Sequence, residues 1–276
     1  MGHAIAERLL AKRFALTVWN RTAGKAGALT RRGAKLASTP RAAAASADIV
    51  ALCLRDAEAV EEVLFGADGA AESLRATSVV LDFSTLGIEP TRVLADRVAA
   101  KTKAPWVDAP VSGGPGGARA GSLAIFCGGT KKTVRRVAPV LKALSRQSTH
   151  MGAVGAGQAT KLCNQLIAST AMLAVSEAIS AAKAFGLNTR LIPKALAGGY
   201  ADSLPLQIFG PRMASQRLTP RISEIGTMHK DVKAVLQALA QANAQLRLID
   251  AAGSIYERAM EQGLGPEDLG ALVRLK

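Results

Sequence analysis

Aromatic side chains and cysteines are scarce in this chain of 276 residues, and each shortage argues against a class of protein. Phe, Trp and Tyr make up 4% of the residues, which leaves little basis for a stacking platform that binds single-stranded nucleic acid. The cysteines Cys53, Cys127 and Cys163 are odd in number and far apart, so we predict no disulfide framework. This pattern favours a reducing compartment, and we expect a cytoplasmic protein.

Patterns typical of metal binding and of membrane insertion are also lacking. His3, His150 and His229 do not have the spacing of metal ligands, so we expect no metal site. No charged start followed by an apolar stretch indicates a signal peptide. The most apolar run, residues 166–175, is too short to cross a bilayer, and we expect no membrane partner.

Acidic residues are fewer than basic ones. The chain has 35 Lys and Arg against 21 Asp and Glu, a formal charge of +14. This balance favours anionic partners such as phosphorylated cofactors, carboxylate substrates or nucleic acid. Because the basic residues are spread along the sequence without a long cationic run, nucleic acid is an unlikely partner on this criterion.

The order of predicted elements divides the chain into two domains. Over residues 1–151, short apolar strands alternate with helices, which is typical of an α/β fold with a parallel sheet covered on both faces. Over residues 152–276 we predict only helices, beginning with one long helix. Strands are predicted at residues 14–19, 35–37, 48–54, 78–83, 106–111 and 122–128. Helices are predicted at residues 4–12 and 24–32, from Pro40 through the alanine run that follows it, and at residues 58–65, 90–100, 134–144, 158–185, 191–196, 203–215 (interrupted by Pro205, Gly210 and Pro211), 225–242 and 246–262, with a last helix opening at Pro266.

The long helix carries the most informative side chains. Residues 158–185 contain no Gly or Pro, and at about 1.5 Å per residue such a helix is about 40 Å long. Lys161 and Asn164 are three residues apart and therefore lie on one face. An ammonium near the helix start faces the positive end of the macrodipole, so partial burial would lower the pKa of Lys161 and let it exchange a proton near neutral pH. A solvated lysine at a helix start is the alternative.

Several predicted strands end in candidate contacts to a ligand, at the carboxyl ends where ligands of parallel sheets bind. These candidates are Asn20, Arg21, Thr22, Leu54 and Thr85. An Arg just past the second strand of such a sheet can hold a 2′-phosphate, so Arg21 favours NADP over NAD. A surface turn is the alternative for residues 20–22, because Asn and Thr are common turn residues. Residues 113–117 lack the Lys-Ser/Thr ending of a P-loop, which argues against nucleotide hydrolysis.

Three motifs follow one another with the spacing of a known family. They are Asp108-Ala-Pro-Val-Ser-Gly-Gly114 with Gly117-Ala118 and Gly121, then Gly155-x-Gly157 with Lys161 and Asn164, then Lys230-Asp231. Together with Val18-Trp-Asn-Arg-Thr22, they resemble the β-hydroxyacid dehydrogenases, a family that includes 3-hydroxyisobutyrate dehydrogenase and tartronate semialdehyde reductase. The resemblance covers essentially the whole chain.

The resemblance implies an NAD(P)-dependent oxidoreductase that acts on a small 3-hydroxy acid or its semialdehyde. The family fold is a Rossmann domain, a long interdomain helix and an all-α domain, commonly in homodimers or homotetramers. The resemblance also implies that Lys161 is the catalytic acid/base. It implies that Ser112, Gly113 and Gly114 hold the substrate carboxylate, with Asn164 beside them. Thr85 and Lys230 are expected near the nicotinamide end of the cofactor, for which we expect NADP rather than NAD.

Two departures from the family pattern have consequences. Gln165 stands where the family often has a second Asn after the lysine, which would alter substrate selection. Only Met1-Gly2 matches the end of the family's Gly-Leu-Gly-x-Met-Gly pattern. We therefore expect a Rossmann-type sheet without its first strand, and about ten further residues upstream in the functional polypeptide. The helix start at Gly2 is then the expected contact to the pyrophosphate.

Two other functions stay open at this point. One is an imine reductase of similar architecture, although those enzymes typically lack the catalytic lysine. The other is a non-catalytic module of the same fold that binds nucleic acid through its positive charge.

Overall fold

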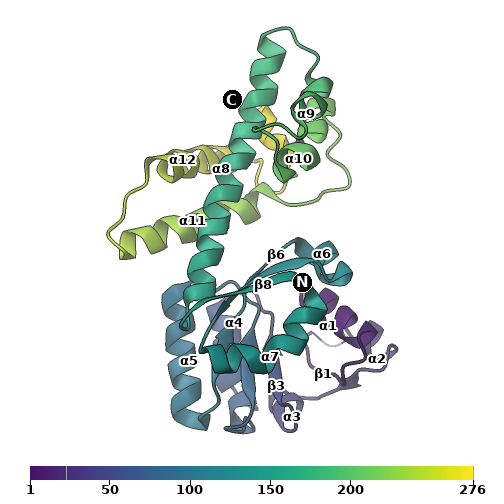
Figure 1. Cartoon of the computed structure of the whole chain (residues 1–276), viewed down its shortest axis with the longest axis vertical. Helices are drawn as coiled ribbons and strands as arrows, with labels where there is room; N and C mark the ends of the chain where they lie inside the picture. The colour runs from purple at the N-terminus through teal and green to yellow at the C-terminus, as the bar shows by residue number, and fades with distance from the viewer. Residues whose placement is uncertain (23, 276) are drawn as a thin grey trace. The chain divides into compact units, whose positions relative to one another are not determined.

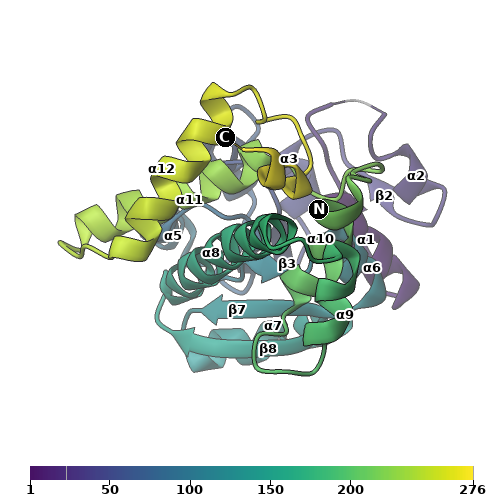
Figure 2. The same cartoon turned by 90° about the horizontal axis from the view of Figure 1, so that it is seen from above.

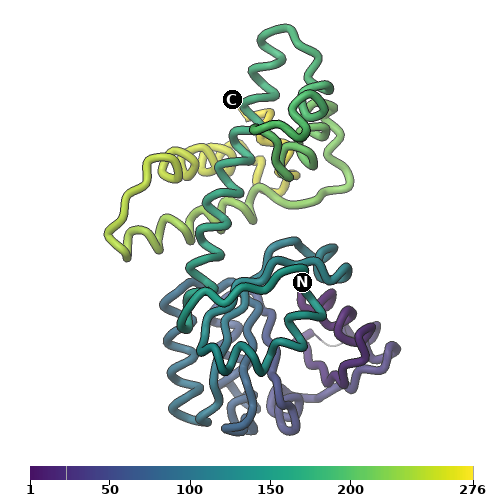
Figure 3. The backbone as a smooth tube through the Cα atoms, viewed as in Figure 1, coloured from purple at the N-terminus to yellow at the C-terminus, as the bar shows by residue number. Residues whose placement is uncertain are grey.

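The computed structural model describes residues 1–22 and 24–275 and divides into two compact units, Met1–Lys161 and Leu162–Lys276. The division lies within one helix, α8 (Ala156–Ala184), which begins in the first unit and continues in the second (Figure 1). The backbone of each unit can be followed in Figure 3. The boundary predicted between residues 151 and 152 lies just before α8, and it stays a prediction.

The first unit is an α/β fold, as predicted. Its larger sheet has the order β3-β4-β5-β7-β6, with β8 paired to β7, and a separate two-stranded sheet consists of β1 and β2. The strands are β1 (Thr17–Val18), β2 (Lys35–Leu36), β3 (Ile49–Leu52), β4 (Val79–Asp82), β5 (Trp106–Asp108), β6 (Val111–Ser112), β7 (Leu123–Gly128) and β8 (Ser145–Gly152). The strands β3, β4 and β5 are parallel neighbours, and β1 is parallel to β2.

The sheet differs from the prediction in three respects. It is mixed, because β7 runs antiparallel to β5 and β6 while β8 is parallel to β7. The strand predicted at residues 106–111 is divided into β5 and β6, with Pro110, which has no N–H for a ladder, between them. The strand β8 was not predicted, because its sequence Ser-Arg-Gln-Ser-Thr-His-Met-Gly has no apolar run. Its exposed residues fit its pairing to β7 alone among the described strands.

The described strands form two separate sheets, and the break between them lies where we expect the first strand to be missing. Within the described residues, β1 pairs only with β2, and β3 pairs only with β4. Thr17 of β1 and Ala51 of β3 are exposed, whereas all four residues of β4 are buried. The two sheets therefore each have an unpaired edge, and the proposed upstream residues stay a prediction.

Helices cover both faces of the larger sheet, as the near-continuous apolar strands predict. On one face α1, α6 and α7 pack against Val79, Leu81 and Val107, and on the other α3, α4 and α5 pack against Val80 and Trp106. The helices are α1 (Gly2–Ala11), α2 (Gly27–Thr30), α3 (Pro40–Ala44), α4 (Ala57–Phe65), η1 (Ala70–Glu72), α5 (Ile88–Thr102), α6 (Gly114–Ala120) and α7 (Lys131–Leu144).

Side-chain caps start three of these helices. Thr39, Asp56 and Thr130 each accept a hydrogen bond from the backbone N–H three residues on, at 3.0, 3.0 and 3.1 Å. Such a bond satisfies one of the N–H groups that have no partner within the helix. The cap at Thr130 explains why α7 begins at Lys131, three residues before the predicted start.

The second unit is helical after α8, as predicted. Tyr256 is fully buried and donates a hydrogen bond to Ser169 O at 3.1 Å, which joins α12 to α8. Its further helices are η2 (Thr189–Leu191), α9 (Ile192–Leu196), α10 (Leu204–Ser215), α11 (Ile225–Gln241), α12 (Arg247–Glu261) and η3 (Leu269–Arg274). The predicted interruptions in α10 are wrong, because the helix continues through Gly210 and Pro211. The helix predicted from Pro266 is also wrong, since a short 3₁₀ helix forms from Leu269 instead.

One helix has the length and composition of a membrane span, which the run at residues 166–175 did not indicate. In α8, an 18-residue window has a mean hydropathy of at least 1.2, and 44% of that window is buried. The core helix of a soluble protein meets the same criterion, so a single such helix is weak evidence for a membrane.

Candidate functional site

The carboxyl ends of β3 and β4 are joined by the side chain of Ser84. Leu54 N donates to Ser84 Oγ at 2.9 Å, and Ser84 N donates to Asp82 Oδ1 at 2.9 Å. Asp82 is fully buried, and burial raises its pKa to about 6, against the hydrogen bonds from Ser84 that lower it. Leu54 and Thr85, two predicted cofactor contacts, are therefore held at the same sheet edge, the one at which ligands of such folds bind.

Gln158 fastens the residues around Thr85 to the start of α8. Its side chain is 1% exposed, donates from Nε2 to Ser84 O at 2.9 Å and accepts at Oε1 from Leu86 N at 3.2 Å. The carboxamide thus bridges the two residues that flank Thr85. A glutamine side chain offers one acceptor and one donor group, and Gln158 uses both.

Asp108 fixes the first turn of α8 to the end of β5. Its Oδ1 accepts from Gly155 N at 2.8 Å and its Oδ2 from Gln158 N at 3.0 Å. Burial raises the pKa of the Asp108 carboxyl group, while the hydrogen bonds from Gly155 and Gln158 oppose that rise. A Cβ at Gly157 would lie 2.4 Å from Phe126 O, so the glycine is needed for this close approach. The glycine-rich motif therefore lets the helix start lie directly on the sheet.

Lys161 lies one turn after this anchor and is half-buried. The prediction from sequence considered the macrodipole of α8 and partial burial, but not a neighbouring carboxylate. Asp108, when ionised, places a negative charge at the same helix end and acts on a cation in the first turns against the macrodipole. Both groups define the electrostatic surroundings in which a proton on Lys161 would be exchanged.

Gly2 lies where the start of α1 meets the end of β3. A Cβ on Gly2 would lie 3.4 Å from Cys53 Cβ, so a larger side chain would crowd this approach. The first turn of α1 has no acidic residue, and burial raises the pKa of the Cys53 thiol to about 11, which keeps it neutral. A helix start with N–H groups and no acidic residue in its first turn fits the pyrophosphate of a dinucleotide.

The other predicted cofactor contacts of this unit follow β1. Asn20 Nδ2 donates to Thr22 O at 2.9 Å, so the segment forms the turn that the alternative interpretation predicted. Arg21 is exposed, and within residues 1–22 and 24–275 no carboxylate lies within salt-bridge distance of it. Its guanidinium is therefore available to an anionic group.

The predicted carboxylate-binding residues lie where β6 leads into α6. Ser112 is the last residue of β6 and pairs with Ala124 of β7. Gly113 and Gly114 have φ angles of +123° and +63°, which only glycine adopts readily. This backbone turns sharply at the predicted substrate position and carries no side chain that would block a small anion.

In the second unit, Asn164 belongs to a hydrogen-bonded row of side chains. Asn164 Nδ2 donates to Gln165 Oε1 at 2.7 Å, and Gln165 Nε2 donates to Asp231 Oδ2. Lys230 is the neighbour of Asp231 on α11. The departure at Gln165 thus links α8 to the Lys230-Asp231 motif and holds the Asn164 amide.

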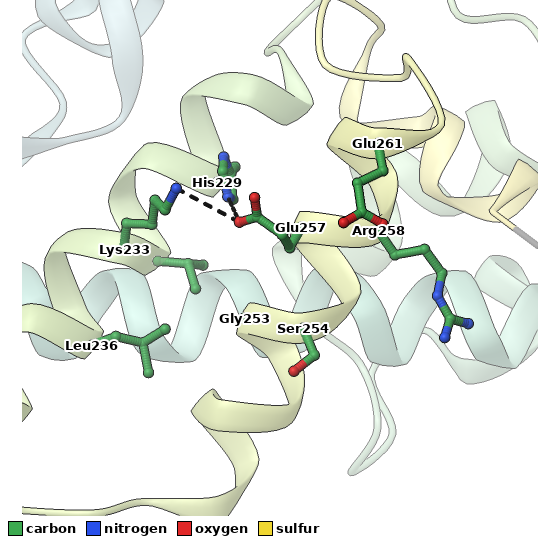
Figure 4. Close-up of a pocket in the computed structure, with 9 residues that line it drawn as sticks. His229, Lys233, Leu236, Gly253, Ser254, Glu257, Arg258 and Glu261 are labelled. Carbon is green, nitrogen blue, oxygen red and sulfur yellow. Dashed lines mark hydrogen bonds and ion pairs between the residues drawn. The ribbon is translucent and has the colours of Figure 1, made fainter.

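A pocket between α11 and α12 lies beside this motif but contains none of the predicted residues (Figure 4). His229 Nε2 and Glu257 Oε2 are 2.7 Å apart, and Lys233 Nζ lies 3.6 Å from the same oxygen. The hydrogen bond with His229 and the charge of Lys233 lower the pKa of Glu257. Ser254 lines the pocket but donates to Asp250 O, so the cluster is not arranged as a nucleophile with its base.

Sequence reasoning missed three residues of the site, namely Asp82, Asp108 and Gln158. Asp108 was noted only as the first residue of a family motif, and Gln158 only as the start of a helix. A polar residue that ends an otherwise apolar strand was the available signal for Asp82 and Asp108. Nothing in the local sequence distinguishes Gln158 from an exposed glutamine.

Both units match models of known protein families. Residues 1–152 match the model for the NAD binding domain of 6-phosphogluconate dehydrogenase. Residues 155–276 match the model described as NAD-binding of NADP-dependent 3-hydroxyisobutyrate dehydrogenase. The chain is 32% identical over 242 residues to 2-hydroxy-3-oxopropionate reductase of Escherichia coli, which covers 88% of this chain and 82% of the relative. The chain belongs to the β-hydroxyacid dehydrogenase family.

Solved structures agree with this membership of the β-hydroxyacid dehydrogenases. The 3-hydroxyisobutyrate dehydrogenase of Mycobacterium tuberculosis, determined with L-serine, has 26% identity and a TM-score of 0.88, with 99% of this chain and 94% of that one covered. An imine reductase from Pseudomonas sp. has the fold at 23% identity and a TM-score of 0.64, with 100% and 95% covered. This β-hydroxyacid dehydrogenase is thus an NAD(P)-dependent oxidoreductase with the predicted fold.

Proposed function

We propose that the enzyme transfers a hydride between NADP(H) and a small 3-hydroxy acid or its semialdehyde, with Lys161 as the acid/base. The observation that carries the proposal is the anchoring of α8, because Asp108 and Gln158 fix the turn before Lys161. The names of two relatives, a reductase of 2-hydroxy-3-oxopropionate and a dehydrogenase of 3-hydroxyisobutyrate, support the substrate class.

Each proposed residue has a task in this reaction. The bound nicotinamide supplies or accepts the hydride. Lys161 gives a proton to the substrate oxygen during reduction and takes it back during oxidation. Ser112, Gly113 and Gly114 bind the substrate carboxylate through a hydroxyl group and backbone N–H groups, and Asn164 adds a side-chain amide.

Different residues are proposed to contact different groups of NADP(H). The start of α1 at Gly2 holds the pyrophosphate, and Arg21, with Asn20 and Thr22, holds the 2′-phosphate. Leu54 is a further proposed contact to the cofactor, and Thr85 and Lys230 are the proposed contacts near its nicotinamide end. The exposed Arg21 and the NADP-dependent family model for residues 155–276 support NADP over NAD.

We also propose a homodimer or homotetramer in the cytoplasm. The family resemblance supports the oligomer. Three free cysteines support a reducing compartment, with Cys127 buried and Cys163 exposed. Light scattering on a size-exclusion column measures the oligomer, and a monomer at micromolar concentration would contradict it.

The test of the reaction is a substrate screen combined with a change at Lys161. Small 3-hydroxy acids, their semialdehydes and a cyclic imine are offered with NADPH or NADP, and absorbance of the reduced cofactor is followed. We expect turnover of a hydroxy acid or semialdehyde, and for Lys161→Ala a kcat lower by about 10²–10⁴ with NADPH affinity nearly unchanged.

Lys183→Ala is the matched control, because Lys183 is an exposed lysine in the last turn of the same helix. It should leave kcat within twofold of the parent. Turnover of the imine alone, or a Lys161→Ala variant as active as the control, would show that the proposed reaction or the role of Lys161 is wrong.

A further inference from the structure

We propose that α7 and β8 form a binding face for the backbone of double-stranded nucleic acid. Residues 109–176 contain eight Lys and Arg and no Asp or Glu. Six of these cations lie on α7 and on β8, the strand that follows it directly. We call them the cationic face: Lys131, Lys132, Arg135, Arg136, Lys142 and Arg146.

The fold gathers five of these cations on one side of the amphipathic helix α7, and Arg146 follows on β8. All six are exposed, whereas Val137, Val140, Leu141 and Leu144 are buried on the opposite side of α7. At about 100° per residue, Lys131, Arg135 and Lys142 fall within about 40° of one another, and Lys132 and Arg136 border them. From Lys131 to Lys142 the helix rises about 16 Å, which corresponds to about five phosphates of one strand at roughly 3.4 Å each.

The charge of this face is not neutralised within the chain. In the part of the chain that the structure describes, no carboxylate lies within 4 Å of any of the six side chains. Arg136 donates to the backbone at Thr77 O. Other cations of the same unit are paired, for example Arg75 with Asp48 and Arg119 with Glu7. Asp96 is the one acid that shares a pocket with Lys131, at one end of the face.

The neighbouring strand adds groups that suit phosphate oxygens. On β8, Gln147, Ser148 and Thr149 are exposed, and β8 is the outer strand beside β7 (Figure 2). Amide and hydroxyl side chains commonly donate hydrogen bonds to phosphates, which position a duplex without reading its sequence. The face therefore predicts affinity that is independent of base sequence and strongly dependent on salt.

The chemistry of the face favours a duplex over other polyanions. A helix that lies on a membrane presents large apolar side chains to the lipid, and the exposed side of α7 has none. A single strand is bound by stacking on aromatic rings, and neither α7 nor β8 contains Phe, Trp or Tyr. The cations were expected to be dispersed because the sequence has no long unbroken cationic run, although five of them lie within residues 131–142.

The test measures fluorescence anisotropy of a labelled 20-base-pair DNA duplex with the full chain at 50, 100 and 200 mM salt. The variant is Lys132→Gln with Arg135→Gln and Lys142→Gln, none of which has a role in the proposed reaction. The control removes three exposed cations from the second unit, by Lys183→Gln, Arg190→Gln and Lys194→Gln, so that both proteins have the same net charge.

We expect the parent chain to bind the duplex, and the α7 variant to bind it at least about tenfold more weakly at 100 mM salt. The slope of log K against log salt should fall by about 2.7, since each lost phosphate contact contributes about 0.9. The control should bind within twofold of the parent. Far-ultraviolet circular dichroism confirms the fold, and Lys132→Glu alone replaces the triple variant if that variant does not fold.

Four results would overturn the proposal. They are no duplex binding by the parent chain at 50 mM salt, equal binding by the α7 variant, an equal loss in the control, and tighter binding to phosphatidylglycerol vesicles or to the single strand than to the duplex.

Discussion

Asp82 carries a carboxyl group in the core of the first unit, where a negative charge is unfavourable. Its pKa of about 6 lies above the value of about 3.9 of an unfolded chain. Between these two pH values the folded state binds more protons than the unfolded state, so the free energy of unfolding falls as pH rises from about 4 to about 6. Two pKa units correspond to about 3 kcal/mol, a large part of the stability of a domain.

Replacing this carboxyl group by an amide should remove that pH dependence. Asp82→Asn keeps an acceptor for Ser84 N but has no charge to bury. Urea unfolding between pH 4 and 7 should show a decline that is smaller by about 3 kcal/mol in the variant than in the parent. Asp68→Asn, at an exposed position with φ of 53°, is the control and should keep the parental decline. Parallel curves for Asp82→Asn and the parent would refute the assignment.

Arg21 should determine the choice between the two cofactors. A charge-assisted hydrogen bond contributes about 1.5–3 kcal/mol, so contact with the 2′-phosphate predicts at least a tenfold preference for NADPH over NADH. Arg21→Ala should reduce this preference, while Lys25→Ala, an exposed cation nearby in sequence, should retain it. Titration of both cofactors by protein fluorescence measures the effect. Equal affinity of the parent chain for NADPH and NADH would exclude the proposed role.

At the scale of the element, the stability of α8 depends on the hydrogen bonds that the Gln158 side chain makes in the first turn of the helix. Gln158→Met keeps the volume but leaves Leu86 N and Ser84 O without their partner. At about 1–3 kcal/mol for each unsatisfied group, we expect a loss of about 2–6 kcal/mol in the free energy of unfolding. Gln237→Met changes an exposed glutamine on α11 and should stay within about 0.5 kcal/mol of the parent. A Gln158→Met variant as stable as this control would show that the bridge is dispensable.

The same element shows which features a sequence reveals. The length of α8 was predictable because residues 158–185 lack Gly and Pro, and β4 was predictable from its apolar run. The anchor of α8 was not, because Asp108 meets Gly155 and Gln158 across 47 and 50 residues, and only the fold brings them together. Likewise β8 has no apolar signal of its own, and its conformation follows from pairing with β7. Local patterns thus predicted elements and family motifs, whereas the polar contacts between them required the structure.

On the scale of the whole molecule, the two sheets of the first unit should differ in the free energy of local opening. The pair β1–β2 is short and is held by backbone bonds such as Lys35 N to Leu16 O and Ala37 N to Val18 O. Isolated two-stranded pairs are marginally stable, whereas Val80 and Phe83 donate bonds within a buried sheet. Hydrogen–deuterium exchange should therefore be faster at Lys35 and Ala37 than at Val80 and Phe83. Equal protection at all four amides would contradict independent opening of the pair.

Because β1 and β2 form a small separate sheet, the amide exchange of this pair should also report cofactor binding. Arg21 lies three residues after the end of β1, so a ligand that it holds favours the closed form of the pair by mass action. NADPH should slow amide exchange at Lys35 and Ala37, while Val80, already protected, should change little. The exchange rates of the Lys35 and Ala37 amides would then measure how much of the enzyme holds cofactor, in the absence of turnover.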